Sequence, residues 1–362
     1  MSQPSLPLVD PDGPASDEGG LFGVQVSVQD AALVVIPVPW EATASYGRGT
    51  ARGPEAVRAA SLQVDLEDLQ FGAVWTRGLG WAGDVAVAVA EDAEATEDAA
   101  LYVIDAGGAD QPSADAELVA ARDLVDLGSA RVRAAVRSAA EAALDRGALA
   151  AVLGGDHSSP LGLIEAVAAR HPGVGILHVD AHADLRVAYL GFRESHASIM
   201  HNALELPGVA CLVGVAYRDL GSAEVARIAD DPAITAFYDR DLGAARCAGQ
   251  SFDSLVEAIV EKLPQKVYLS IDIDGLDPVL CPETGTPVPG GLGWHELCAL
   301  LVRVSACRTV VGFDLCEVAP GAAAGARRDG WDAIVGARVL YKLAGAALCS
   351  QAGSVDPDSA SL

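Results

Sequence analysis

Short apolar runs alternate with longer segments along most of this chain. Runs rich in Val, Ile and Leu are typical of strands that are buried on both faces of a parallel sheet. They predict strands at residues 32–38, 149–153, 175–179, 209–215, 267–273 and 309–315. The longer segments predict helices at residues 56–66, 130–146, 160–170, 251–262, 293–305 and 331–348. This alternation indicates an α/β fold whose mostly parallel sheet is covered by helices on both faces.

Two stretches break the alternation. Residues 1–30 are rich in Pro, Asp, Gly and Ser, which favours a loose N-terminal extension. Residues 91–117 are acidic and Ala-rich without clear periodicity, and we expect a loop or irregular excursion there. Because no internal repeat or linker divides the remainder, we expect one domain at residues 31–350 and a C-terminal tail at residues 351–362.

Polar clusters fall where the predicted strands end, which is where α/β folds bind their ligands. Asp180, His182 and Asp184 follow one strand, and Asp272 and Asp274 end another. In an extended backbone such alternate residues project to the same side. Five side chains that bind metals would then face one another, and two adjacent divalent ions can turn water into hydroxide near neutral pH.

A sixth candidate ligand, His157, follows the strand at residues 149–153. A lone Asp at a strand end usually caps a helix or turn, but here three strand ends would have to gather six such residues by chance. Carboxylates and imidazoles suit Mn, Fe, Co, Ni or Zn. Asp180 and Asp272 are the natural bridges between two ions, whereas we expect His178 to pack behind the ligands.

The charge of the chain narrows the choice of partners. The formal net charge is −26, which argues against nucleic acid and anionic membranes and is compatible with a cationic substrate. No apolar run approaches the roughly 20 residues that span a bilayer. We see no secretion signal, and the seven scattered cysteines form no C-x-x-C pair. These features favour a cytoplasmic protein with reduced thiols.

Several motifs together resemble the ureohydrolase family, which includes arginases and agmatinases. Three of them contain the candidate ligands, and they lie at residues 154–158, 180–184 and 270–278. Further similar segments lie at residues 45–50, 53–58 and 284–287. The resemblance covers roughly residues 33–348. It implies a three-layer α/β fold, a homotrimer or homohexamer, and the hydrolysis of a guanidinium compound to urea with two divalent ions, Mn or Ni.

The resemblance also implies roles for single residues. One ion is expected at His157, Asp180, Asp184 and Asp272, and the other at Asp180, His182, Asp272 and Asp274. Glu317 resembles the glutamate that anchors the guanidinium group, to which a carboxylate offers paired acceptors. His196 resembles the histidine that carries protons, a task that suits a pKa near neutrality.

The substrate stays open between free guanidine and agmatine. The loop at residues 185–196 resembles agmatinase-type members, which disfavours arginine. The turn at residues 38–41 instead faintly resembles nickel-dependent guanidine hydrolases, and Trp40 would narrow the pocket for a small substrate. We therefore expect Trp40, Arg193 and Thr286 beside the substrate. A guanidino-acid hydrolase of the guanidinobutyrate type and a non-catalytic paralogue are the alternatives.

Overall fold

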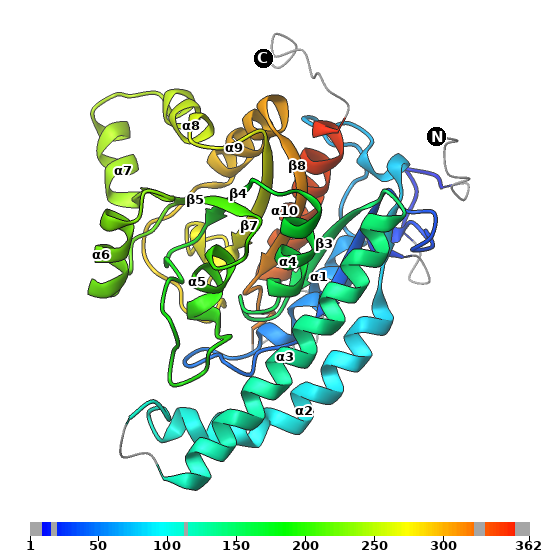
Figure 1. The fold of residues 1–362 in the computed structure, drawn as a ribbon. Helices are drawn as coiled ribbons and strands as arrows, with labels where there is room; N and C mark the ends of the chain where they lie inside the picture. Colours follow the sequence, from blue (N-terminus) through cyan, green and yellow to red (C-terminus); the bar gives the residue numbers. More distant parts are fainter. Residues whose placement is uncertain (1–8, 16–19, 112–114, 322–329, 352–362) are drawn as a thin grey trace.

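The fold is built on one parallel sheet of eight strands (Figure 1). The computed structural model describes residues 9–15, 20–111, 115–321 and 330–351. The strand order is β2-β1-β3-β8-β7-β4-β5-β6, and each neighbouring pair is parallel. The strands are β1 (Leu33–Val38), β2 (Leu79–Trp81), β3 (Leu149–Gly154), β4 (Val174–Val179), β5 (Val209–Val215), β6 (Ile234–Phe237), β7 (Lys266–Asp272) and β8 (Thr309–Cys316).

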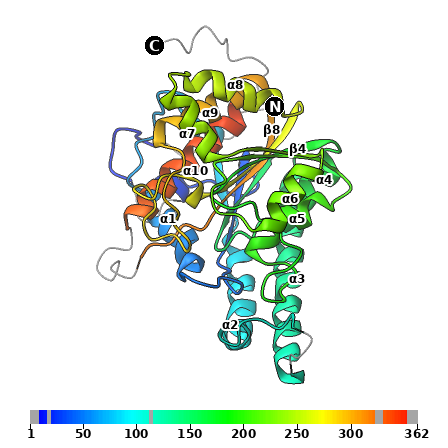
Figure 2. The same ribbon diagram turned by 90° about the vertical axis from the view of Figure 1, so that its left-hand side faces the viewer.

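Helices cover both faces of the sheet, which Figure 2 shows between its two helical layers. Successive strand residues point to opposite faces, so Leu33 and Val35 join one core cluster while Val34 and Ile36 join the other. The first layer holds α1 (Gly53–Ser61), α7 (Asp239–Cys247), α8 (Phe252–Glu261), α9 (Trp294–Cys307) and α10 (Trp331–Ser350). The second holds α2 (Gly83–Asp105), α3 (Ala116–Asp145), α4 (Leu161–Arg170), α5 (Ile199–Leu204) and α6 (Ser222–Asp230).

The three-layer α/β fold and its parallel sheet are therefore confirmed. The predicted strands agree with β1, β3, β4, β5, β7 and β8 to within about one residue at each end. The sequence did not predict the edge strands β2 and β6 or the short helices α5, α6 and α7. Short elements at an edge have few buried positions, and their apolar pattern is correspondingly weak.

The prediction of a loop at residues 91–117 is wrong for residues 91–105 and 116–117, which belong to α2 and α3, and these helices form a long antiparallel pair. Val103 of α2 and Val125 of α3 are fully buried, so each helix hides its narrow apolar side among its neighbours. The side chain of Asp115 begins α3 by accepting the N–H of Leu118 at 2.7 Å. The lower ends of both helices project beyond the rest of the molecule (Figures 1 and 2). We call this pair the α2–α3 hairpin.

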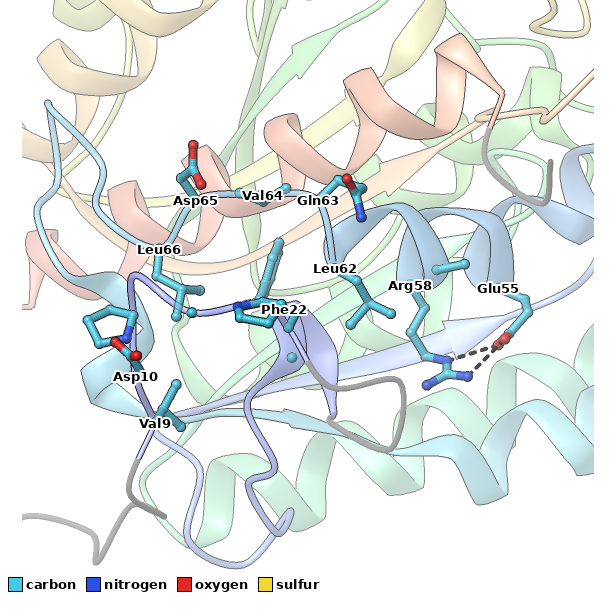
Figure 3. A pocket seen from close by; sticks show the side chains of 16 residues that line it. Val9, Asp10, Phe22, Glu55, Arg58, Leu62, Gln63, Val64, Asp65 and Leu66 are labelled. Atoms are coloured by element: carbon cyan, nitrogen blue, oxygen red, sulfur yellow. Dashed lines mark hydrogen bonds and ion pairs between the residues drawn. The ribbon is translucent and has the colours of Figure 1, made fainter.

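The expected loose N-terminal extension also needs correction. Leu21 and Phe22 are 1% and 2% exposed, and the Phe22 ring centroid lies 4.6 Å from that of Tyr341 in α10. Residues 21–24 therefore belong to the core beside α1 and α10, while residues 1–8, 16–19 and the predicted tail from residue 352 lie outside the described part. A cavity of about 950 Å³ separates residues 9–15 from α1 and the chain that follows it (Figure 3).

One helix contradicts the expectation that no apolar segment is long enough to span a bilayer. α10 has 20 residues, and an 18-residue stretch within it has the mean hydropathy, 1.4, of a membrane span. However, 78% of this 18-residue stretch is buried inside the fold. The apolar character of α10 is explained by its position against β8, α1 and α9, where it forms core on several sides.

Candidate metal centre

The four central strands bring the polar clusters together at one edge of the sheet. In the order β3-β8-β7-β4, these strands run parallel, so their carboxyl ends meet side by side. His157 follows β3, Glu317 follows β8, Asp272 ends β7, and Asp180 follows β4. Residues that are 160 positions apart in the chain, such as His157 and Glu317, thereby become neighbours.

His157 lies at the centre of the first group of candidate ligands. Its Nδ1 atom is 3.3 Å from Oδ2 of Asp180, 3.2 Å from Oδ2 of Asp272 and 3.6 Å from Oδ2 of Asp184. All four side chains are buried. Each carboxylate thus directs an oxygen at the same point as the imidazole nitrogen, which is the arrangement that surrounds a small cation.

His182 forms a second group with two aspartates. Its Nδ1 atom lies 3.1 Å from Oδ2 of Asp274 and 3.4 Å from Oδ1 of Asp180. The two oxygens of Asp180 therefore face different groups, as a carboxylate that bridges two ions does. Thr286 stands beside this group, with its hydroxyl 3.3 Å from Oδ2 of Asp274.

The sequence suggested that strand alternation brings these side chains together, but in the structure they meet in another way. β4 ends at Val179, and the chain then bends, with Asp184 at a positive φ of 53°. β7 ends at Asp272, whose side chain accepts the N–H of Asp274 at 2.8 Å and so caps the single turn of 3₁₀ helix at Ile273–Gly275. The correct residues meet, but turns after the strand ends orient them.

The electrostatics of the cluster favour a bound cation. Burial raises the pKa of Asp184 and Asp272, and repulsion from the neighbouring carboxylates raises it further. Burial opposes protonation of His182, but Asp180 and Asp274 outweigh it and raise its pKa to about 12. The buried carboxylates therefore require positive charge, which either protons or metal ions supply.

Two unpartnered atoms show where the cation fits. Nδ1 of His157 and Oδ2 of Asp180 are buried and have no hydrogen-bond partner among the described residues. Buried polar atoms are normally paired, so two unpaired atoms 3.3 Å apart indicate a missing ligand between them. Oxygen and imidazole donors with no thiol suit ions such as Mn or Ni. The residues present therefore fit a pair of divalent ions.

Glu317 adds a carboxylate next to this cluster. It follows β8 directly and has a positive φ of 62°, a strained conformation for a side chain of its size. Its Oε1 accepts the backbone N–H of His157 at 2.9 Å, while its own N–H is donated to the carbonyl of Gly155. Burial, together with the charge of Asp272, raises the pKa of Glu317 well above its usual range.

A cavity of about 260 Å³ opens above the cluster. Most of the predicted site residues line it, whereas Asp180 and Asp274 do not reach its wall. The full lining comprises Ser45, His157, His182, Asp184, Arg186, Tyr189, His196, Ala197, Asp219, Leu220, Gly221, Glu224, Asp272, Thr286 and Glu317. The structure thus brings a carboxylate, a histidine and the candidate ligands around one space for a small molecule.

His196 is held in this cavity wall by a hydrogen-bonded chain that the sequence did not predict. The Thr43 hydroxyl lies 2.8 Å from a carboxylate oxygen of Asp156 and 3.2 Å from Nδ1 of His196. The same hydroxyl oxygen accepts the backbone N–H of His196 at 3.1 Å. Burial lowers the pKa of His196, which favours its neutral form.

Two predicted substrate contacts are not at the cavity. Trp40 is 1% exposed and packs in the core, where a Cβ on Gly128 of α3 would meet its ring at 3.0 Å. The side chain of Arg193 is 78% exposed and lies 3.9 Å from Asp126 of α3. Neither residue lines the cavity, so the idea of a pocket narrowed by Trp40 is corrected. The sequence could not show on which side of the chain these two residues point.

The sequence did not predict several other residues of the cavity. The Arg186 guanidinium lies over the Tyr189 ring at 4.6 Å and 3.6 Å from Glu224. The Tyr189 ring meets His196 edge-on, with the ring centroids 5.8 Å apart. Asp219 also lines the cavity. It follows β5, so its position after the carboxyl end of a strand was the one feature of the sequence that could have predicted this. No ion pair to Asp219 occurs within the described residues.

Comparisons with known proteins agree with this geometry. The sequence model of the arginase family matches residues 31–345. The N(1)-aminopropylagmatine ureohydrolase of Synechocystis is 32% identical over 295 residues, which cover 81% of this chain and 83% of the relative. The agmatinase of Pyrococcus horikoshii is 29% identical over 328 residues, covering 88% and 93%. The crystal structure of an agmatine ureohydrolase from Thermoplasma volcanium shares the fold, with a TM-score of 0.66, 24% identity and coverage of 91% and 94%.

Proposed function

The chain belongs to the arginase family, and we propose that it hydrolyses a guanidino-amine of the agmatine class to release urea. We further propose that the reaction uses two divalent ions bound at the metal centre. The observation that carries this proposal is the cavity itself. It places Glu317, a carboxylate able to accept a guanidinium group, beside the His157 and His182 groups. The reaction replaces one C–N bond of the guanidinium group by a C–O bond and yields urea and an amine.

The residues that would hold the ions follow from the distances above. His157, Asp180, Asp184 and Asp272 would hold one, and Asp180, His182, Asp272 and Asp274 the other. When bound, a pair of divalent ions lowers the pKa of water and so supplies a nucleophile near neutral pH. Both Mn and Ni are compatible with this donor set.

Glu317 would bind and orient the substrate. One of its oxygens already accepts the N–H of His157, which fixes the carboxylate, and Glu317 lines the cavity. A planar guanidinium donates paired N–H groups to a carboxylate, which gives both attraction and alignment. A bound cation would also favour the charged form of Glu317, whose pKa burial otherwise raises.

His196 would carry the proton that the departing amine needs. Asp156 is an acceptor only, so the Thr43 hydroxyl donates to it and accepts the Nδ1–H of His196. In the neutral ring this leaves Nε2 as the proton-accepting atom. His196 lines the cavity, and its neutral form allows it to take up a proton and then release it.

The charges at the other end of the cavity favour a substrate with a second cationic group. Arg186 lies beside Glu224, which also accepts the N–H groups of Leu185 and Gly221. Asp219 has no such partner within the described residues, and it would attract an ammonium group and repel a carboxylate. This favours agmatine over guanidinobutyrate. Free guanidine loses its main support with the corrected position of Trp40.

Urea release tests the proposal. The purified chain, loaded with Mn²⁺ or with Ni²⁺, is assayed with agmatine, N(1)-aminopropylagmatine, free guanidine, guanidinobutyrate and arginine. We expect the highest kcat/KM with one of the two guanidino-amines. Preference for guanidine or guanidinobutyrate would refute the substrate class, and no urea from any of them would leave the non-catalytic paralogue.

The assembly and the compartment belong to the same proposal. The resemblance to ureohydrolases supports a homotrimer or homohexamer, and the scattered cysteines of the sequence favour the cytoplasm. Size-exclusion chromatography with light scattering measures the mass of the assembly directly, and a monomer would contradict the proposed trimer or hexamer. Fluorescence microscopy of the tagged chain in its own cells tests the proposed cytoplasmic location.

A further inference from the structure

A buried tyrosine–histidine pair lies directly behind the candidate bridging carboxylate Asp180. Nε2 of His178 is 2.9 Å from Oδ2 of Asp180, and Nδ1 of the same ring is 2.7 Å from the hydroxyl of Tyr217. All three side chains are fully buried. Neither His178 nor Tyr217 lines the cavity, so the pair contacts the metal centre from the protein side and does not contact a substrate.

The fold makes room for this pair. His178 of β4 lies opposite Gly214 of β5, and a Cβ on Gly214 would meet the ring and hydroxyl of Tyr217 at 2.2–2.4 Å. The glycine therefore lets the Tyr217 ring lie across β5 and reach the neighbouring strand. The His178 ring is also 5.2 Å from the His157 ring, measured between centroids, so it is held on two sides.

The directions of the hydrogen bonds follow from which atoms carry protons. The Asp180 carboxylate accepts only, so the ring nitrogen that faces it must be the protonated one. The other ring nitrogen faces the Tyr217 hydroxyl, which can donate to it. Nδ1 then accepts the Tyr217 hydroxyl proton, while the protonated Nε2 lies 2.9 Å from Oδ2 of Asp180 without a hydrogen bond of regular geometry. The tyrosine in this way fixes the tautomer of the histidine.

We propose that His178 and Tyr217 position Asp180 for metal binding, and that the strength with which this chain holds its ions depends on them. Oδ2 of Asp180 has no formed hydrogen bond within the described residues, so only His178 behind it and His157 in front of it restrain its direction. The other oxygen is fixed by the N–H of His182 at 2.6 Å. Partners that orient a ligand from behind typically change metal affinity by about 10- to 100-fold.

Mn²⁺ titration of the full, metal-free chain by calorimetry tests the proposal. His178→Leu removes the donor while keeping apolar bulk, and Tyr217→Phe removes only the hydroxyl. His178→Gln supplies an amide N–H that reaches as far as Nε2 does. Tyr341→Phe is the matched control, because Tyr341 is another buried tyrosine, whose hydroxyl donates to the Leu66 carbonyl at 2.6 Å.

We expect the dissociation constant for Mn²⁺ to rise about 10- to 100-fold in His178→Leu and about 10-fold in Tyr217→Phe. His178→Gln should recover most of the loss, and Tyr341→Phe should bind as the wild type does. All variants should still take up two ions at saturation. Unchanged affinity in His178→Leu and Tyr217→Phe, or an equal loss in Tyr341→Phe, would overturn the inference.

Two further outcomes distinguish a positioning role of His178 from a direct ligand role and from failure of the proposed function. Saturation of His178→Leu with only one ion would make His178 a direct ligand and would refute the positioning role. The inference rests on the proposed metal-dependent function, which the wild type tests by itself. Wild-type urea release with unchanged affinity in the variants rejects only this inference, whereas a wild type that binds Mn²⁺ without releasing urea rejects only the proposed function.

Discussion

The hydroxyl of Thr43 lies 3.2 Å from Nδ1 of His196, although 153 positions separate the two residues in the chain. Because this hydroxyl donates to Asp156, it acts as an acceptor toward the imidazole ring. One threonine thus determines which nitrogen of the proposed proton carrier is free.

We predict that Thr43→Val lowers kcat about 10-fold or more, because the isosteric side chain can no longer fix the His196 tautomer. Thr43→Ser keeps the hydroxyl and should retain most of the activity. Steady-state kinetics across pH 6–9, with metal content measured in parallel, checks this. Equal activity of Thr43→Val and Thr43→Ser would show that the contact is only structural.

Asp272→Ala should lose metal and activity together, because each proposed ion shares this carboxylate. We expect less than one ion per chain after dialysis and at least about a 100-fold lower rate of urea release. Asp277→Ala is the matched control, since Asp277 lies in the same motif but is exposed and only caps the N–H of Val279. Elemental analysis of both variants decides the point, and full metal content in Asp272→Ala contradicts it.

Metal affinity should rise with pH. The pKa of His182 in the metal-free chain is raised to about 12, so this histidine is protonated at neutral pH and must lose its proton when an ion binds. At that site we expect about one proton released per ion and a tenfold gain in affinity per pH unit between pH 6 and 9. Calorimetry in buffers of different ionisation enthalpy measures the proton release, and a flat pH dependence would disprove it.

Asp219→Asn should weaken the binding of guanidino-amines selectively. A hydrogen bond to a charged group contributes about 1.5–3 kcal/mol, so the KM for agmatine should rise about 10-fold or more while kcat changes little. Free guanidine has no second cationic group, and its kinetics should stay unchanged. An equal effect on both substrates would remove Asp219 from substrate recognition.

The carboxylate of Asp126 in α3 should help to hold in place the loop that lines the cavity. Its carboxylate accepts the backbone N–H of Arg193 at 3.1 Å, in the loop that carries Tyr189 and His196 into the cavity. Loss of one such bond in Asp126→Ala costs about 1 kcal/mol, which predicts a roughly fivefold higher KM with unchanged Mn²⁺ affinity. Asp126→Asn retains an acceptor and serves as the control. A fall in metal affinity would instead indicate a general loss of structure.

The metal cluster was predictable because its residues sit at strand ends. In a parallel sheet the carboxyl ends of adjacent strands must meet, so apolar runs followed by Asp and His are enough to bring His157, Asp180 and Asp272 together. Sequence could not predict the turns that orient them. Asp184 at positive φ and the 3₁₀ turn after Asp272 depend on local geometry that periodicity does not encode.

Residues on loops were predicted less well. Trp40 stood beside a motif and was placed at the substrate, but its ring packs against α3. Thr43, only three positions later, contacts His196 instead. The α2–α3 hairpin was missed because its two helices bury only narrow stripes, while Ala residues also occupy many exposed positions, so the helical period is faint.

The segment between the two helices of that hairpin contacts the loop that carries Tyr189. The N–H of Ala109, in the segment after α2, is donated to the Leu190 carbonyl at 3.0 Å, one residue from Tyr189. The segment that follows α2 is thus hydrogen-bonded to the loop at residues 185–196, which reaches the cavity through Tyr189 and His196. The hairpin therefore supports, from outside the cavity, the loop that carries Tyr189 and His196.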